Sequence, residues 1–341
     1  EIEVHNHDGD TALMVAAAND NIDVVEELID AGADVHALGF GDHTALSCAT
    51  TAEVADALIA AHADVNAQDQ MDCTPLMLAS LTRRSDVVDT LLEANAAVNA
   101  KDLTGMSALL YSLQTYSERP QVDEHTVKAL LKEKAHVDGT DENGHGALHL
   151  AVRNCENASI LKKLLKTCKQ QVQAGVDVNA RTHKGTTALM RAVLHDPASL
   201  PALLDSDRAD LDARDNYGLT ALIKAAYKVD AHATKLLLDA GARWEPQHPA
   251  EISAFMDIPV CSGKFILGLL DKDNVPNQGH RRESSTEENI NEENTLEVLQ
   301  LLIAAKADVN QTVPAYYPPL RAAFERPEVL RVLLKAGADV D

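Results

Sequence analysis

A short segment of the type Thr-Ala-Leu recurs along this chain and constrains its fold more than any other feature. It opens at eight positions, which are Thr11, Thr44, Thr74, Ser107, Gly146, Thr187, Thr220 and Ser253. Five of the seven spacings are 33 or 30 residues, and the other two are 39 and 41 residues. A second marker, written GADVHA from Gly32, follows in the same phase. Two markers in one phase predict a stack of similar units rather than one globular core.

The first unit shows why each copy forms two helices. Thr11 can cap a short helix over residues 12–18, because its hydroxyl accepts a free backbone N–H. Asn19-Asp20-Asn21 interrupts that helix, and apolar residues from Ile22 onward then recur at helical spacing. Gly32 suits a left-handed C-cap. Neither helix can bury its apolar face alone, so the units must stack.

The closest copies of the first marker are TPLMLAS from Thr74, GALHLAV from Gly146 and TALIKAA from Thr220. With the 33-residue period, these segments resemble the ankyrin-repeat family. The resemblance implies an all-α solenoid of about ten stacked helix–turn–helix repeats with β-hairpin-like turns. It covers essentially the whole chain and says little about which partner is bound.

Departures from the period divide the chain. Residues 1–275 are predicted to hold about eight repeats, with insertions near 115–124 and 166–174, the second of which lengthens a helix by two turns. Residues 276–294 are acidic, lack a helix face and are expected to be a disordered insertion or degenerate repeat. Residues 295–341 hold C-terminal repeats, starting with a helix from Thr295. The chain begins and ends inside a repeat, so we expect a fragment of a longer protein.

Charge and cysteine usage exclude several classes of partner. The net charge of −23 repels nucleic acid and anionic lipid. No apolar run is long enough to insert into a membrane. The five cysteines form no CxxC pair, which favours a reducing, cytoplasmic location with the nucleus left open.

The sequence contains none of the common catalytic motifs, so we expect neither an enzyme nor a bound cofactor or metal. His149 lies at the family position where histidines brace the turns. Ser284 and Ser285 are candidate phosphorylation sites, because Arg281 and Arg282 precede them and glutamates follow at the third position.

Members of the family bind partners with their turn tips and first helices, which places the candidate contact residues here. Apolar tip residues, unfavourable in water, are Phe40, Met71 and Leu103. The expected groove runs from Gly146 to Lys228 and is locally basic between 181 and 228. There Arg191 and Lys224 replace earlier apolar residues and must meet water or an opposite charge. The full candidate set adds Arg153, Arg181, Lys184, Arg214, Tyr217 and Lys228.

These residues predict a scaffold or adaptor that holds an extended protein segment carrying an acidic motif, and no small-molecule substrate. In a competing account the bases only balance a very acidic chain. The alternative function is a regulatory or targeting arm of a larger enzyme, ligase, channel or secreted effector.

Overall fold

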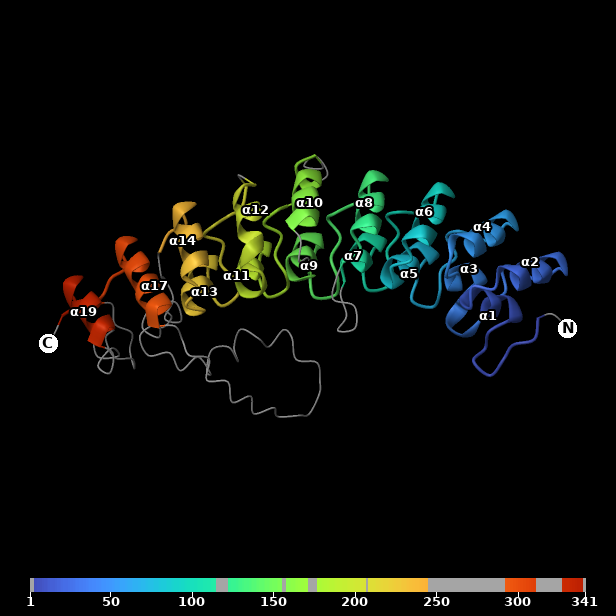
Figure 1. Cartoon of the computed structure of the whole chain (residues 1–341), viewed down its shortest axis with the longest axis horizontal. Helices are drawn as coiled ribbons and strands as arrows, with labels where there is room; N and C mark the ends of the chain where they lie inside the picture. The colour runs from blue at the N-terminus through green and yellow to red at the C-terminus, as the bar shows by residue number, and fades with distance from the viewer. Residues whose placement is uncertain are drawn as a thin grey trace. The chain divides into compact units, whose positions relative to one another are not determined.

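The computed structural model describes residues 3–114, 122–154, 158–170, 177–206, 208–244, 292–310 and 327–339 (Figure 1). The chain divides into two compact units, Glu1–His183 and Lys184–Asp341, and each is described by itself. The described residues form helices and no β-strand, as the all-α prediction requires. Within this part of the chain, no helix has the length and apolar character needed to cross a lipid bilayer.

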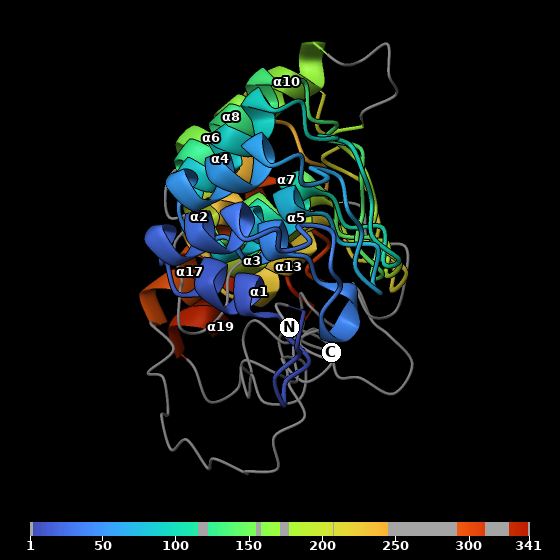
Figure 2. The same cartoon turned by 90° about the vertical axis from the view of Figure 1, so that its right-hand side faces the viewer.

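The first unit is built from two layers of helices (Figure 2). The first helices of successive repeats pack against one another in one layer, and the second helices do so in the other. The first helices are α1 (Ala12–Ala18), α3 (Ala45–Cys48), α5 (Pro75–Thr82), α7 (Ala108–Leu113) and α9 (Ala147–Asn154). The second helices are α2 (Ile22–Asp30), α4 (Ala52–Ala60), α6 (Ser85–Glu93), α8 (Glu124–Lys132) and α10 (Ala158–Gln170).

The second unit repeats the same scheme over the part that the structure describes. Its first helices, α11 (Ala188–His195) and α13 (Ala221–Tyr227), contact each other. Its second helices α12 (Leu200–Leu204), α14 (Ala231–Asp239), α17 (Glu292–Ala304) and α19 (Pro327–Lys335) contact one another in that order. The 3-10 turn η3 (Pro197–Ser199) leads into α12.

The predicted N-caps are present on the first helices. The hydroxyl oxygen of Thr11 accepts the backbone N–H of Met14 at 3.3 Å. Thr44, Thr74, Ser107, Thr187 and Thr220 accept the equivalent N–H in their own repeats. Each hydroxyl satisfies a backbone donor that the helix leaves free, which explains why the marker opens with Thr or Ser. Gly32 has φ of +84°, the left-handed C-cap predicted for it.

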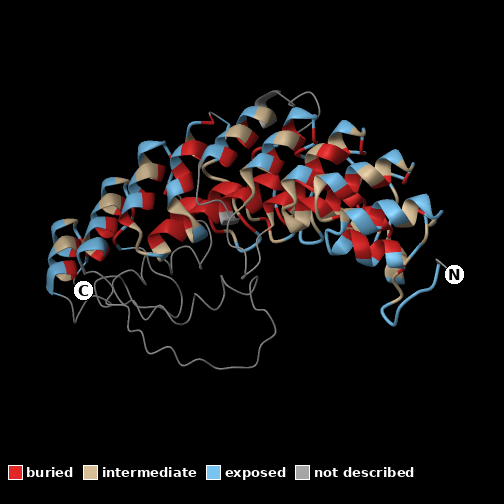
Figure 3. Ribbon diagram, turned by 45° about the vertical axis from the view of Figure 1, so that its right-hand side comes forward, coloured by how far each residue is buried: buried red, intermediate tan, exposed pale blue. Residues whose placement is uncertain are grey.

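The buried residues, drawn red in Figure 3, are concentrated in the two layers of helices, and most of them are apolar. Val25, Leu58, Leu91 and Leu130, one from each of four successive second helices, are all 0% exposed. The second marker then links neighbouring repeats. The Asn66 side-chain oxygen accepts the Ala97 backbone N–H at 2.7 Å, and Asn99 does the same for His136 at 2.7 Å. The recurring asparagine therefore holds one turn to the next.

The irregular segments are only partly as predicted. Helix α10 has 13 residues, against nine in α2, α4, α6 and α8, so the second helix of that repeat is longer by about one turn within the described residues. Residues 292–294, which were expected to belong to a disordered insertion or a degenerate repeat, form the first turn of α17. The helix tolerates their polarity because Glu293 and Asn294 are exposed. Residues 115–121, 171–176 and 245–291 lie outside the described part.

Candidate functional site

The turns between repeats end in tight tips that one carboxylate organises. A tip consists of the two residues that follow Asp69, Asp102, Asp141 or Asp215, and in the repeat of Phe40 it follows Gly39 at the equivalent position. One carboxylate oxygen of Asp69 accepts the N–H groups of Met71 and Cys73, each at 2.8 Å. Asp102, Asp141 and Asp215 bind the N–H groups two and four residues ahead in the same way. The tip backbone is thereby fixed, and its side chains project outward.

Backbone hydrogen bonds also join one tip to the next. In the first unit the Gln70 N–H donates to the Gly41 carbonyl at 3.0 Å, and the Leu103 N–H donates to the Met71 carbonyl at 3.0 Å. In the second unit the Asn216 N–H donates to the Lys184 carbonyl at 3.0 Å. These bonds give the hairpin-like character that the family resemblance implies, without forming a regular strand in the described residues.

Three consecutive tips of the first unit carry exposed apolar side chains. Phe40 is 80% exposed, Met71 50% and Leu103 65%, so the predicted exposure of all three is observed. Phe40 lies in the short 3-10 turn η1 (Phe40–Asp42), and its Cβ lies within 2.9 Å of the position that a Cβ on Gly9 would occupy. Because Gly9 has no Cβ, the turn around Gly9 can lie directly against the tip of Phe40.

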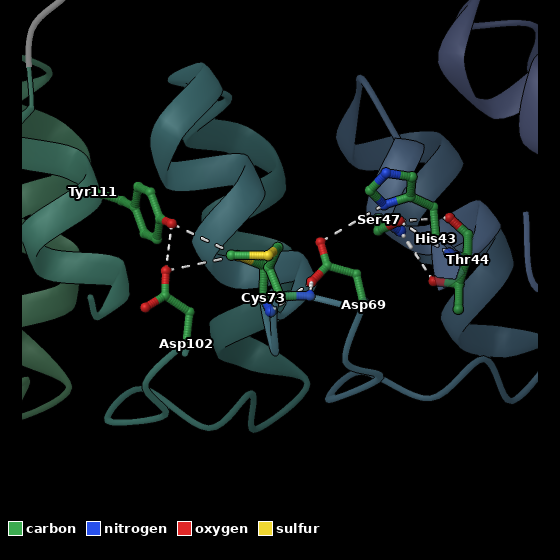
Figure 4. A network of polar contacts seen from close by, with 8 residues as sticks. His43, Thr44, Ser47, Asp69, Cys73, Asp102 and Tyr111 are labelled. Atoms are coloured by element: carbon green, nitrogen blue, oxygen red, sulfur yellow. Dashed lines mark hydrogen bonds and ion pairs between the residues drawn. The ribbon is translucent and has the colours of Figure 1, made fainter. Parts of the chain in front are cut away.

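Beneath these tips lies a polar network that includes Cys73, Asp102 and Tyr111 (Figure 4). The Tyr111 hydroxyl donates to Asp102 Oδ2 at 2.5 Å. The Cys73 sulfur lies 3.6 Å from the Tyr111 oxygen and 3.9 Å from Asp102 Oδ2. On the other side, His43 Nδ1 lies 3.8 Å from Asp69 Oδ2. The network ties the tip of one repeat to the first helix of its own repeat and to the preceding turn.

The pKa shifts of Cys73 and Asp102 indicate that this network has a structural role and not a reactive one. Burial raises the pKa of the Cys73 thiol, and the nearby carboxylates of Asp69 and Asp102 raise it further. The thiol therefore stays protonated at neutral pH and is a poor nucleophile. Burial also acts to raise the pKa of Asp102, but hydrogen bonds from Tyr111, Thr104 and Met106 outweigh it and leave the pKa below its usual value.

Lys224 and Arg191 are placed differently from the basic groove predicted for them. The side chain of Lys224 is only 3% exposed, and its Nζ lies 2.6 Å from Oδ2 of Asp215, whose side chain is 2% exposed. Arg191 is 6% exposed. The charge of Lys224 is therefore balanced by the Asp215 carboxylate and is not exposed to water. Both residues are part of the packed interior and are not available to a partner, which corrects the prediction.

A sequence signal for this pairing exists. Tyr111 and Lys224 both lie four residues after the capping residue of their helix and nine residues after the aspartate of their tip. Both bind that aspartate through a side-chain donor. The repeat of Arg191 carries Thr182 at the aspartate position, so the rule does not extend to it. A side-chain donor nine residues after a tip aspartate therefore indicates a structural pair, and this spacing would have identified Lys224 as structural.

The remaining candidates fall into three groups. Arg181 and Tyr217 are exposed and Lys184 is half-buried. Two bases are already engaged with backbone carbonyls, since Arg214 donates to Gly218 at 3.0 Å and Lys228 donates to Leu194 at 2.6 Å. Arg153 lies in α9, but its side chain is outside the described part, as are Ser284 and Ser285.

The histidines also have structural surroundings. His149 is buried and its Nδ1 accepts the Gly146 N–H at 3.2 Å, so it braces the turn of its own repeat. His145 contacts the Asp141 carboxylate at 3.0 Å. Across the described residues, no group of three or more His, Cys, Asp or Glu side chains is arranged to hold a metal ion.

Comparison with known proteins agrees with this architecture. Residues 13–102, 43–120, 76–174 and 158–248 match the family described as ankyrin repeats (3 copies). The neurogenic locus notch homolog protein 2 of human and of mouse are each 30% identical over 198 residues, which is 55% of this chain and 8% of those proteins. The chain thus spans a small part of these relatives.

Two solved structures are also similar. The ankyrin repeat domain of Bcl-3, described as a unique member of the IkappaB protein family, is 26% identical, with a TM-score of 0.50 over 68% of this chain and all of that chain. The human ASB11 ankyrin repeat domain shares the fold, with 22% identity and a TM-score of 0.55 over 70% of this chain and all of that chain. The repeat markers, the layered helices and the matches over residues 13–248 place this chain in the ankyrin-repeat family.

Proposed function

We propose that this chain is a protein-binding scaffold whose main contact surface is the row of apolar tips in the first unit. Ankyrin repeats are in general modules for protein–protein interaction, and repeat stacks present extended binding surfaces. The observation that carries the proposal is the exposure of Phe40, Met71 and Leu103 on three consecutive tips. Exposed apolar side chains gathered in one row favour contact with another protein.

The rigidity of the tips supports this assignment. A carboxylate fixes the backbone of the Met71 tip and of the Leu103 tip, and backbone bonds from Gln70 and Leu103 join neighbouring tips, including the tip of Phe40. A surface that is already ordered loses little conformational entropy on binding, so more of the contact energy appears as affinity. Phe and Met, the residue types of two of these tips, are enriched in the buried cores of protein–protein interfaces.

The spacing of the tips suits an extended segment of the partner. Packed helices lie about 8–10 Å apart, and an extended chain advances about 3.3 Å per residue. Neighbouring tips therefore correspond to positions about three residues apart in the bound segment. We propose that apolar side chains at this spacing contact Phe40, Met71 and Leu103.

We also propose that the bound partner carries an acidic motif, although fewer basic residues of this chain are available to bind it than the sequence predicted. Arg191 and Lys224 are excluded because they are buried. Arg181, which is exposed in the first unit, remains a candidate for binding carboxylates of the partner. Charge-assisted pairing with carboxylates favours arginine in particular. We further propose that the chain acts by binding rather than catalysis, inside the cell.

A quantitative affinity capture tests the tip surface. The chain carrying Phe40→Ser, Met71→Ser and Leu103→Ser should lose partners that the unchanged chain retains from the same extract. A variant with Val24→Ser and Leu334→Ser, which are 41% and 43% exposed but lie on second helices, provides the matched control and should retain them. Equal retention by the tip variant, with its helical content unchanged by circular dichroism, would refute the proposal.

A second candidate is a binding arm within a larger protein. The relatives that match this chain are far longer than the matched part, since it makes up 8% of their length. The full sequence of the native protein distinguishes the two cases by the presence or absence of a catalytic or membrane domain beside the repeats.

A further inference from the structure

The second helices of the first unit form an outer row that carries a sharp change of charge. Helices α2, α4, α6, α8 and α10 follow one another along this row, and each contacts its neighbour (Figure 2). They lie in the layer opposite α1, α3, α5 and α7, and the binding surface proposed above makes no use of them. All five belong to the same compact unit, so their order along the row is fixed.

The first three helices of this row are uniformly acidic. Helices α2, α4 and α6 contain nine aspartate or glutamate residues and no lysine or arginine. Asp23, Glu26, Glu27 and Asp30 on α2 are all exposed, as are Glu53 and Asp56 on α4 and Asp86 and Glu93 on α6. We call this surface the acidic face.

The next two helices are basic, in a chain whose net charge is −23. Helix α10 contains four lysines and no acidic residue, and α8 contains two lysines and one glutamate. The two lysines of α8 pair with glutamates, Lys128 with Glu124 at 2.5 Å and Lys132 with Glu133 at 3.8 Å, whereas Lys162 and Lys166 of α10 are exposed. Within the described part of the chain, Lys162, Lys163 and Lys166 form no ion pair. We call this surface the basic face.

We propose that the basic face of one copy of this chain binds the acidic face of a second copy. The argument is charge complementarity between two surfaces that every copy carries. If a two-fold axis passes between α6 and α8, helix α4 of one copy lies opposite α10 of the other, and α6 lies opposite α8. Each contact then forms twice, as in the isologous dimers that are common among proteins.

The net charge of the chain opposes association but does not prevent it. At an ionic strength of about 0.15 M the Debye length is about 8 Å, so charges on distant parts of the two copies are largely screened. Helices packed face to face lie about 8–10 Å apart, where the facing charges still interact. The dimer is therefore weak, reversible and dependent on salt, because exposed ion pairs each contribute little.

Sedimentation velocity of the full chain over a range of concentrations tests the proposal. In about 0.1 M NaCl, where the Debye length is about 10 Å, we expect a monomer–dimer equilibrium, and in about 1 M NaCl, where it is about 3 Å, we expect monomer. The variant Lys162→Glu/Lys166→Glu should weaken dimerisation at least about tenfold. The control Lys101→Glu/Lys235→Glu makes the same change in net charge at exposed lysines outside the row and should dimerise like the unchanged chain.

A charge-swap experiment separates this pairing from a general charge effect. The variant Glu53→Lys/Asp56→Lys reverses charges on α4 and should also weaken self-association. Mixed with Lys162→Glu/Lys166→Glu, it should restore a heterodimer, because both facing pairs of helices are then complementary. The tip variant with Phe40→Ser, Met71→Ser and Leu103→Ser should dimerise normally, so the failure of one proposal leaves the other standing. Monomer at every concentration and salt, a dimer insensitive to salt, or no heterodimer on mixing would each overturn the inference.

Discussion

Replacing Lys224 tests whether its ion pair with Asp215 stabilises the packed interior. Its Nζ lies 2.6 Å from Oδ2 of Asp215, and both side chains are almost fully buried. Lys224→Met keeps much of the side-chain volume but leaves the Asp215 carboxylate buried without its counter-charge. Removing one partner of a buried pair typically costs about 3–5 kcal/mol.

The structure indicates the lower end of this range. Asp215 keeps the backbone N–H groups of Tyr217 and Leu219, each at 2.9 Å, and these continue to stabilise the carboxylate. We therefore expect a loss of about 3 kcal/mol in the free energy of unfolding. In the double variant Lys224→Met/Asp215→Asn, the amide oxygen can still accept both N–H groups and no charge is buried. That variant should lose about 1–2 kcal/mol, less than the single variant, because an unpaired neutral amide costs less to bury than an unpaired carboxylate.

Urea unfolding followed by circular dichroism measures the loss, and hydrogen exchange locates it. The amides of Tyr217 and Leu219 should lose protection in the single variant and recover it in the double variant. An exposed lysine in an open groove would instead cost less than about 0.5 kcal/mol when replaced. A loss that small for Lys224→Met, with unchanged exchange at these amides, would refute the buried-pair interpretation.

Two further substitutions test the network and the stacking. Tyr111→Phe removes a donor to Asp102 and should cost about 1–2 kcal/mol at pH 7. The pKa of Asp102 is lowered in the folded state, so its carboxylate stabilises the fold above the unfolded pKa and stops doing so as the pH falls through the folded pKa. The difference in unfolding free energy between the unchanged chain and Tyr111→Phe should therefore vanish in acid. A difference that does not depend on pH would contradict this. Val54 is 0% exposed, so Val54→Ala should lower the free energy of unfolding by about 2 kcal/mol. Val24 lies at the equivalent position of α2 but is 41% exposed, so Val24→Ala should lower it by less than about 1 kcal/mol. Equal losses in urea unfolding would show that burial between repeats does not set the stability.

Local chemistry explains why much of the fold could be predicted from the sequence. A capping hydroxyl at Thr11 and the interruption at residues 19–21 predict α1 over residues 12–18, and the helix has those bounds. A glycine at Gly32 predicts a positive φ, which is observed. These features depend on interactions within a few residues, and the repeat then carries the same pattern to its neighbours. The irregular segments were predicted less well, because polarity alone did not reveal that residues 292–294 begin a helix.

The candidate site was less predictable, because it depends on contacts between distant residues. The tip positions of Phe40, Met71 and Leu103 followed from the repeat, and their exposure agrees. The environment of Lys224 did not follow from its own charge, since it is set by an aspartate nine residues earlier that the turn brings beside it. The acidic and basic faces were also not predicted, because residues far apart in the sequence form them only when the second helices pack side by side.

Photo-crosslinking shows directly whether the partner contacts the tips of the first unit or its outer helices. A benzophenone amino acid placed at position 40, 71 or 103 reports contact at the tips, and one placed at Glu26 on α2 reports contact on the outer face. With a captured partner, the account predicts efficient crosslinks from the three tip positions and few from position 26. Crosslinks from position 26 alone, with none from the tips, would contradict the account and move the partner to the opposite layer.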